Sequence, residues 1–130
     1  MRDNPTTTAR PFLVLGALGG LLSVALGAFA AHGLKPILSP GLLEIFHTGV
    51  DYQAMHSLAL LLVGLLADRL PARPLRIAGW AFASGILIFS GSLYLLALTD
   101  ARWLGAITPI GGSAFLLGWG ALAWAAARKA

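Results

Sequence analysis

The chain has 130 residues, of which 58% are hydrophobic and 11% are charged, and its net charge of +4 is scattered singly between apolar runs. A soluble domain of this size carries about 25% charged residues, so the composition excludes a soluble enzyme and a disordered chain. Nucleic acid is not an expected partner, because no basic stripe with interleaved aromatic residues is present. Without cysteine, disulfides and iron–sulfur clusters are also excluded.

The first apolar run covers residues 12–31, and Pro11 suits the first turn of a helix, where its missing N–H costs nothing. Small residues recur along the run at a spacing that lets another helix approach closely, namely Gly16, Gly20, Ser23, Gly27 and Ala31. A secretory signal with an A-x-A cleavage site at residues 28–30 is an alternative interpretation. The run is longer than a signal core and three further runs follow it, which favours a retained helix.

The second run begins at Ser39 and Pro40, which suit the N-cap and the first turn of a helix. This helix could continue to Ala67, about 28 residues or roughly 42 Å, which is longer than the bilayer core requires. We therefore expect residues 40–49 to form an amphipathic lead-in at the interface, with a possible bend at Gly49, and residues 50–67 to span the membrane.

Two further spans are predicted at residues 75–98 and 104–126, after a proline-bounded turn and a tight loop respectively. The four spans together predict an all-α fold, an integral membrane four-helix bundle in which residues 1–130 form a single membrane domain.

The distribution of basic residues predicts the orientation. Seven of the nine fall in the two tails and the second loop, namely Arg2, Arg10, Arg69, Arg73, Arg76, Arg128 and Lys129. The other two loops carry only Lys35 and Arg102. Because cytoplasmic loops retain Lys and Arg during insertion, both termini are expected in the cytoplasm.

Polar side chains within the spans are candidates for function, because each is costly to place in a bilayer. When the four helices are aligned by depth, all of them contribute polar residues to the outer third. The candidate binding residues of this layer are His32, Thr48, Asp51, Tyr52, Gln53, His56, Ser90, Ser92, Tyr94 and Thr108. We predict a hydrogen-bonded polar layer near the extracytoplasmic face, with an inner half made mainly of Leu, Ala, Gly and Trp.

The layer has three interpretations: hydrogen bonds that only join the helices, a docking or binding site, and a site of catalysis or transport. A haem is not expected, since His47 and His56 are nine residues apart on one helix and point in opposite directions. Glu44, His47 and Asp51 have metal-ligand chemistry but lack a typical ligand spacing. No metal and no cofactor is predicted.

Four segments resemble a small membrane-protein family called domain of unknown function 423, whose eukaryotic relatives are the transmembrane protein 256 family. They are AFAAHGL at 28–34, TGVDYQAMH at 48–56, FSGSLY at 89–94 and GAITPIGG at 105–112. The resemblance implies a retained first helix, four spans and, for bacterial members, the inner membrane. It implies no activity.

The leading hypothesis is a non-enzymatic binding or accessory subunit, embedded in the lipid bilayer, that docks to a larger complex or a lipid through the polar layer and its glycine-lined helices. Its expected protein partner is another membrane protein or further copies of itself, as a homo-oligomer. One alternative is an oligomeric transport or channel component, since a single four-helix bundle leaves no room for a wide pore. Another is a membrane enzyme that uses His56 and Tyr52 on a lipid-soluble substrate, which predicts a pocket open to lipid beside His56.

Overall fold

The computed structural model describes residues 4–128, and every regular element within them is helical. Arg2 and Lys129, which contribute to the predicted charge bias, lie outside the described residues, as do the two ends of the predicted domain. The elements are α1 (Pro5–Phe29), η1 (Ala30–Leu34), α2 (Pro40–Leu65), α3 (Ala72–Gly85), η2 (Ile86–Ser90), α4 (Gly91–Thr99), η3 (Arg102–Ala106) and α5 (Thr108–Ala127).

The first helix begins earlier than residue 12 because Asn4 and Pro5 form its cap. The Asn4 side chain accepts hydrogen bonds from the Thr6 N–H at 3.1 Å and the Thr6 hydroxyl at 2.8 Å, and Pro5 occupies the first position. Pro11 therefore lies inside α1 rather than in its first turn. At the other end the rod continues through the π-helical turn η1 to Leu34.

The second helix starts as predicted, with Pro40 at the first position and the Ser39 hydroxyl accepting from the Leu42 N–H at 3.3 Å. It continues as one α-helix to Leu65, without an interruption at Gly49. The predicted lead-in and span are thus a single element, because the polar residues of its first half are compatible with helix.

The third rod consists of α3, the π-helical turn η2 and α4, and it ends at Asp100, whose φ of 56° is left-handed. Asp tolerates this conformation better than most residues. Its N–H donates to the Leu96 carbonyl at 2.7 Å, and its carboxylate meets Arg102 Nε at 2.7 Å. The chain reverses there and enters α5 through the short helix η3.

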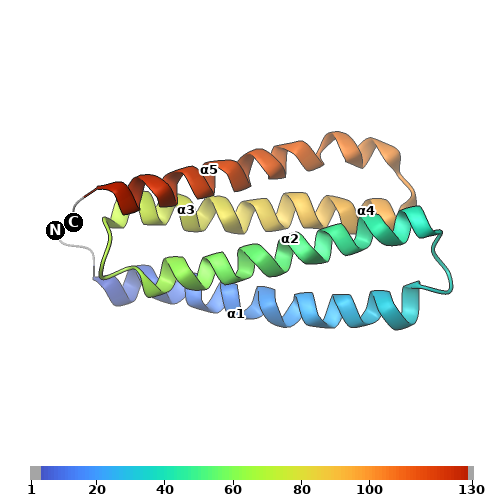
Figure 1. Cartoon of the computed structure of the whole chain (residues 1–130), viewed down its shortest axis with the longest axis horizontal. Helices are drawn as coiled ribbons and strands as arrows, with labels where there is room; N and C mark the ends of the chain where they lie inside the picture. The colour runs from blue at the N-terminus through green and yellow to red at the C-terminus, as the bar shows by residue number, and fades with distance from the viewer. Residues whose placement is uncertain (1–3, 129–130) are drawn as a thin grey trace.

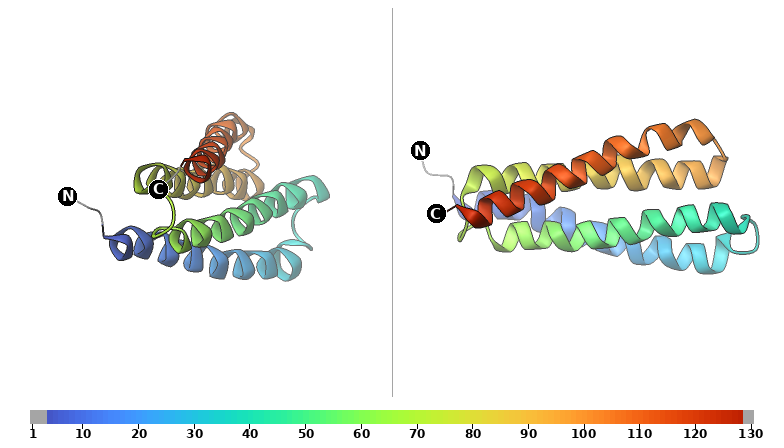
Figure 2. Two further views of the ribbon diagram at one scale, coloured as in Figure 1. Left: turned by 60° about the vertical axis from the view of Figure 1, so that its left-hand side comes forward. Right: turned by 45° about the horizontal axis from the view of Figure 1, so that its top comes forward.

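The four rods lie side by side (Figure 1). In the further views α1 stays beside α2, and α5 stays beside the α3–α4 rod, with α2 joining the two pairs (Figure 2). The start of α1, the end of α5 and the loop between α2 and α3 share one end, here called the basic end because Arg10, Arg69, Arg73, Arg76 and Arg128 are there. The opposite end is called the distal end.

Three helices are long and apolar enough to cross a membrane: Thr6–Leu34, Ala72–Thr99 and Arg102–Ala127. The remaining rod, α2, has 26 residues but lower hydropathy, because Asp51, Gln53 and His56 interrupt its apolar sequence. Length and composition therefore show three membrane-capable helices.

In the half of the molecule nearer the basic end, here called the basic half, aromatic rings pack directly on glycines of the neighbouring helix. The other half is called the distal half. A Cβ added to any of these glycines would meet the ring in front of it. The pairs are Phe12 on Gly79, Phe82 on Gly118, and Phe115 on Gly85. With Leu60, Val63 and Leu75, these rings form the main apolar core.

Candidate functional site

The polar layer is centred on Gln53, whose buried amide connects three rods. Its Nε2 donates to the Gly19 carbonyl of α1 at 2.9 Å. Its Oε1 accepts from the Tyr94 hydroxyl of α4 at 2.6 Å. One α2 side chain thus fixes the relative positions of α1, α2 and α4.

Three serines complete the layer. The Ser90 hydroxyl, in the π-helical turn η2, donates to the Gly49 carbonyl of α2 at 2.7 Å. Ser92 and Thr108 place their hydroxyl oxygens 2.6 Å apart and connect α4 to α5. Ser57 donates to the Gln53 carbonyl of its own helix at 2.6 Å.

His56 is buried with both ring nitrogens occupied. Nδ1 lies 2.7 Å from the Tyr52 carbonyl, which can only accept, so Nδ1 carries the proton. The Trp119 indole N–H donates to Nε2 at 2.9 Å, so Nε2 is unprotonated. Phe115 stacks on the imidazole with ring centroids 3.6 Å apart. The partners define a neutral imidazole with no free nitrogen for a metal or a proton relay.

The layer is chemically complete in itself. Within residues 4–128, every buried side-chain nitrogen and oxygen has a hydrogen-bond partner. In the same part of the chain, no three His, Asp or Glu side chains converge as metal ligands would. Its interior can hold the rods together, and it presents no activated nucleophile or base.

Four of the predicted site residues lie outside this network. Asp51 is exposed on the opposite face of α2 from Gln53. Thr48 donates to the Glu44 carbonyl of its own helix at 3.0 Å. His32 is exposed on η1. Tyr52 lies at the edge, 39% exposed, with its ring centroid 4.6 Å from that of Phe89.

Asp51 belongs to a polar stripe on the exposed face of α2. Its other members are Glu44 and His47, both exposed, and the three residues are here called the acidic stripe. The same face continues toward the basic end with exposed apolar residues, namely Met55, Leu58, Leu62 and Leu65. One helix face therefore changes from polar to apolar between Asp51 and Met55.

A groove of about 480 Å³ opens on the surface between α2 and α5, beside His56. Its lining includes Tyr52, Phe89, Phe115, Leu116 and Trp119. The Tyr52 hydroxyl has no hydrogen-bond partner among residues 4–128, whereas the nitrogens of His56 are both occupied. This α2–α5 groove is aromatic and carries one free hydroxyl.

The polar layer lies away from the distal end, toward the middle of the rods. Gln53 is at the middle of α2, and apolar clusters pack on both sides of it. The cluster toward the distal end contains Leu34, Phe46 and Ala97. The buried polar residues Gln53 and His56 thus lie in the central turns of α2.

Sequence reasoning missed three participants: the Gly19 carbonyl, Ser57 and Trp119. Residue identity does not show which backbone carbonyl accepts a hydrogen bond from another helix. In the sequence, Trp119 is indistinguishable from the other apolar residues of the last span. Ser57 had a signal, because it directly follows His56 at the polar end of an apolar run.

Comparison with known protein families matches residues 26–112 to the family described as Protein of unknown function (DUF423). The chain belongs to this family. A UPF0382 membrane protein of Haemophilus influenzae is 50% identical over 115 residues, covering 87% of this chain and 90% of the relative. The UPF0382 membrane protein YwdK of Bacillus subtilis is 49% identical over 109 residues, covering 83% and 89%.

A third relative, a UPF0382 membrane protein of Staphylococcus epidermidis, is 48% identical over 108 residues, covering 83% of this chain and 88% of the relative. No solved structure matches the chain. The DUF423 match includes Gln53, Tyr94 and the acidic stripe but not Gly19, and the relatives are named as membrane proteins without an activity.

Proposed function

We propose that this DUF423 protein is a four-helix bundle of the bacterial inner membrane, with both ends cytoplasmic, that serves as a non-enzymatic accessory subunit. In this proposal it docks to another membrane protein through the acidic stripe of α2. The self-contained hydrogen bonding of the polar layer supports a structural role for the layer itself.

The surface of α2 supports its crossing the membrane as the fourth span. Gln53, His56 and Ser57 are buried and hydrogen-bonded, so they do not meet lipid. The exposed face from Met55 to Leu65 is apolar. A helix whose polar groups face its neighbours is stable in a bilayer at a mean hydropathy below that of an isolated span.

The charge at the two ends supports the orientation. Five described arginines lie at the basic end, against Lys35 and Arg102 at the distal end. Such a bias over short loops favours a cytoplasmic basic end. A reporter enzyme fused after Ala130 should be active in the cytoplasm, and activity found only outside it would contradict the orientation.

The depth of Asp51 carries the docking proposal. Its neighbour Val50 contacts α1 at Gly27, and Gly49 contacts Leu93 and Tyr94 of α4. At this depth or closer to the distal end, the other rods expose apolar side chains: Phe29 is 49% exposed, Leu95 54% and Ile110 60%. The carboxylate of Asp51 thus lies on the surface of a layer that is otherwise suited to lipid.

An uncovered charge in the bilayer core costs about 2.5–3.5 kcal/mol on insertion scales. Asp51 is about 16 Å from the start of α2, since eleven residues at about 1.5 Å each separate it from Pro40. A partner helix that presents basic or hydrogen-bond-donating side chains to Glu44, His47 and Asp51 would remove this cost. The stripe therefore fits a membrane protein partner better than lipid.

Site-specific crosslinking tests the docking. A photoreactive amino acid at position 47, within the stripe, should yield one crosslinked species in cells. The same group at position 58, on the same face but beyond the stripe, should yield none. Asp51→Leu should abolish the product, and Asp100→Asn, in the exposed distal loop, should not. A product containing only copies of this chain would refute the accessory role, as would equal products at both positions.

A second candidate function is binding of a lipid-soluble ligand in the α2–α5 groove, favoured by its aromatic walls and the free Tyr52 hydroxyl. Native mass spectrometry of gently solubilised protein should then show a bound small molecule. Leu116→Trp, which would fill the groove, should remove it, and Leu62→Trp, at an exposed position of α2 outside the groove, should not. A wild-type spectrum of protein alone would exclude this candidate.

A further inference from the structure

Two open grooves lie at the basic end, and Trp80 of α3 forms a wall of both. The first, between α1 and α3, has a volume of about 630 Å³ and is lined by Arg10, Val14 and Leu15 as well as Trp80. The second, between α3 and α5, has about 540 Å³ and includes Arg73, Ile77 and Leu117. Both combine an arginine with a mainly apolar lining.

The lining residues of each groove are arranged in layers by depth. The ring of Phe12 lies on Gly79, and α1 and α3 both start at the basic end, so Arg10 and Ile77 are at the same depth. Trp80 follows about 4.5 Å deeper, three residues further along the helix, and Leu15 is deeper still. In the first groove a guanidinium, an indole and the aliphatic Leu15 thus succeed one another, as phosphate, glycerol ester and acyl chain do in a phospholipid.

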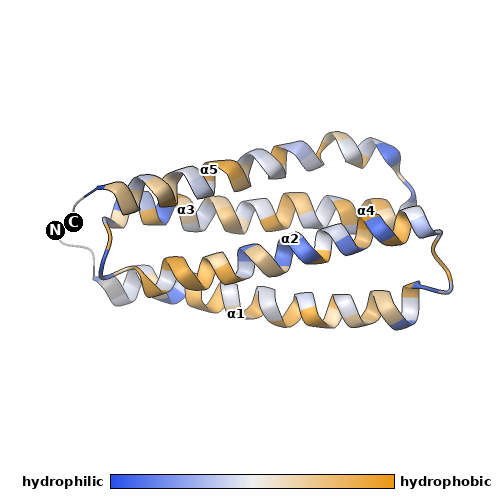
Figure 3. Ribbon diagram, in the orientation of Figure 1, coloured by the Kyte–Doolittle hydropathy of each residue, from blue (hydrophilic) through white to orange (hydrophobic). Residues whose placement is uncertain are grey.

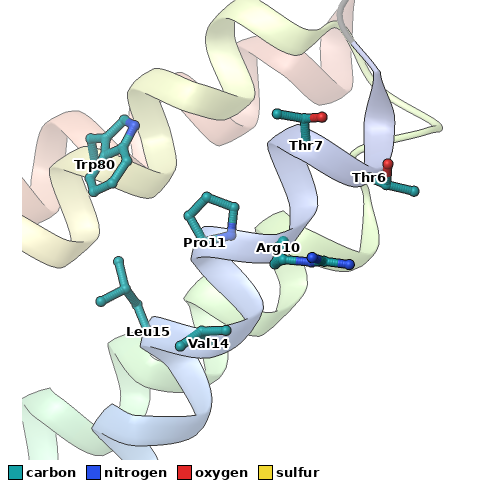
Figure 4. Close-up of a pocket in the computed structure, with 7 residues that line it drawn as sticks. All are labelled: Thr6, Thr7, Arg10, Pro11, Val14, Leu15 and Trp80. Atoms are coloured by element: carbon teal, nitrogen blue, oxygen red, sulfur yellow. The ribbon is translucent and has the colours of Figure 1, made fainter.

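Indole rings prefer the depth of lipid headgroups, where one edge meets polar groups and the body meets hydrocarbon. Figure 4 shows Trp80 projecting from α3 across from Pro11 and Leu15 of α1. The Trp80 ring is packed against Phe12, with centroids 5.2 Å apart, and this contact fixes its position between the two grooves.

Arg10 lines the mouth of the first groove and Arg73 that of the second. Among residues 4–128, the structure pairs neither Arg10 nor Arg73 with a carboxylate. The side chain of Arg10 extends along the surface of α1, away from Trp80 (Figure 4). Because it is exposed, a change of rotamer brings the guanidinium over the groove at little cost.

We propose that the basic end binds an anionic phospholipid, with its phosphate attracted by both Arg10 and Arg73 and its acyl chains in the grooves on either side of Trp80. A guanidinium matches a phosphate in charge and geometry, and the apolar grooves match hydrocarbon chains. A zwitterionic lipid adds a cationic amine that the arginines repel. The site lies at the opposite end from the acidic stripe and does not depend on a protein partner there.

Binding to defined lipids tests the site. The purified full chain in detergent should bind palmitoyl-oleoyl phosphatidylglycerol in preference to the matching phosphatidylcholine, as measured by native mass spectrometry. Arg10→Gln and Arg73→Gln should each weaken phosphatidylglycerol binding about fivefold. Arg102→Gln at the distal end should leave it unchanged. Equal binding of the two lipids, or equal loss with Arg102→Gln, would overturn the proposal.

Salt tests the wild-type chain if the arginine variants fail to fold. At an ionic strength of about 1 M the Debye length falls to about 3 Å, so phosphatidylglycerol binding should drop while phosphatidylcholine binding stays constant. Binding of phosphatidylglycerol that does not respond to salt would refute the role of the arginines.

A pair of tryptophan substitutions tests the acyl-chain groove. Val14→Trp would fill the first groove and should reduce retention of phosphatidylglycerol, whereas Val24→Trp, at an exposed position of α1 outside both grooves, should not. Glycerol phosphate, which lacks acyl chains, should fail to displace the lipid at equal concentration. Displacement by glycerol phosphate, or unchanged retention with Val14→Trp, would reduce the site to a surface anion contact and contradict the proposal.

Discussion

The two halves of this molecule are held together by different physics. Toward the basic end, rings of one helix lie on glycines of the next, and the core is apolar. From the middle toward the distal end, Gln53, Ser90 and Ser92 join the rods by hydrogen bonds, and α2 is the most hydrophilic rod (Figure 3). Lipid is as apolar as leucine, so helices in it associate through close packing and hydrogen bonds.

The two halves should therefore be destabilised by different kinds of substitution. A ring on a glycine leaves no room for added volume, so the basic half should fail when an atom is added. A hydrogen-bonded network fails when one partner is removed, because the other is left buried and unpaired. Substitutions that add one methyl or remove one partner therefore separate the two mechanisms.

Gly118→Ala should have the largest effect. The added Cβ would lie 2.6 Å from Cδ1 and Cε1 of Phe82, a fully buried ring that cannot move aside. We expect a loss of about 3 kcal/mol in the free energy of unfolding, the upper end of overpacking costs. Reversible denaturation in mixed micelles measures it.

Gly120→Ala is the matched control, two residues further along α5. No atom lies within 4 Å of its added Cβ. Replacing a helical glycine by alanine stabilises a helix by about 0.5–1 kcal/mol, so this variant should be slightly more stable than the wild type. Equal losses at positions 118 and 120 would mean that ring-on-glycine packing does not hold the basic half.

Gln53→Leu should cost about 2 kcal/mol, because it removes both hydrogen bonds by which the Gln53 amide joins the rods, to the Tyr94 hydroxyl and to the Gly19 carbonyl. Tyr94→Phe removes the first of these contacts from its other side, so the double variant should lose less than the two single losses summed. Thr48→Val serves as the control, since Thr48 bonds only to its own helix. Strict additivity of Gln53→Leu and Tyr94→Phe would show that the contact carries no energy.

Trp119→Phe should cost about 1 kcal/mol by leaving Nε2 of His56 without a donor while keeping a ring at the site. Nitrogen NMR of the wild-type imidazole should show the neutral tautomer protonated at Nδ1, and Trp119→Phe should shift the Nε2 resonance alone. A wild-type ring protonated at Nε2 would contradict the Trp119 hydrogen bond.

The sequence predicted well how far along the rods the polar residues lie. It predicted poorly which face of the helix each side chain occupies. Depth alignment placed Gln53, Ser90, Ser92 and Thr108 in one layer, and each of them makes a hydrogen bond to another rod in the structure. Asp51 has nearly the same depth as Gln53, but two residues at about 100° each turn it to the opposite face of α2. Only the packing of α2 against three rods decides which face is buried.

Helix starts were predictable where a cap was recognised. Ser39 and Pro40 predict the start of α2, and the helix begins there in the structure. Asn4 and Pro5 carry the same signal but stand before the apolar run, so the start of α1 was placed too late. Membership of the polar layer was visible in the residue types, whereas its carbonyl and indole partners depend on which helices meet.

Ser92→Ala and Thr108→Val should have the smallest effect, about 0.6 kcal/mol of coupling in a double-mutant cycle. Each hydroxyl has a second acceptor in the short helical segment that precedes its own helix: the Ser92 hydroxyl reaches the Phe89 carbonyl of η2 at 2.9 Å, and that of Thr108 reaches the Leu104 carbonyl of η3 at 3.3 Å. Losing one partner therefore leaves no unpaired group, whereas Gln53→Leu removes two hydrogen bonds between rods at once.

Ser113→Ala is the control for this cycle, because its exposed hydroxyl bonds only to the Pro109 carbonyl of its own helix. It should leave stability unchanged. A Ser92–Thr108 coupling energy as large as that between Gln53 and Tyr94 would contradict the expected order of the two contacts. The distal half would then be a uniform network, rather than one strong junction at Gln53 supported by weaker contacts around it.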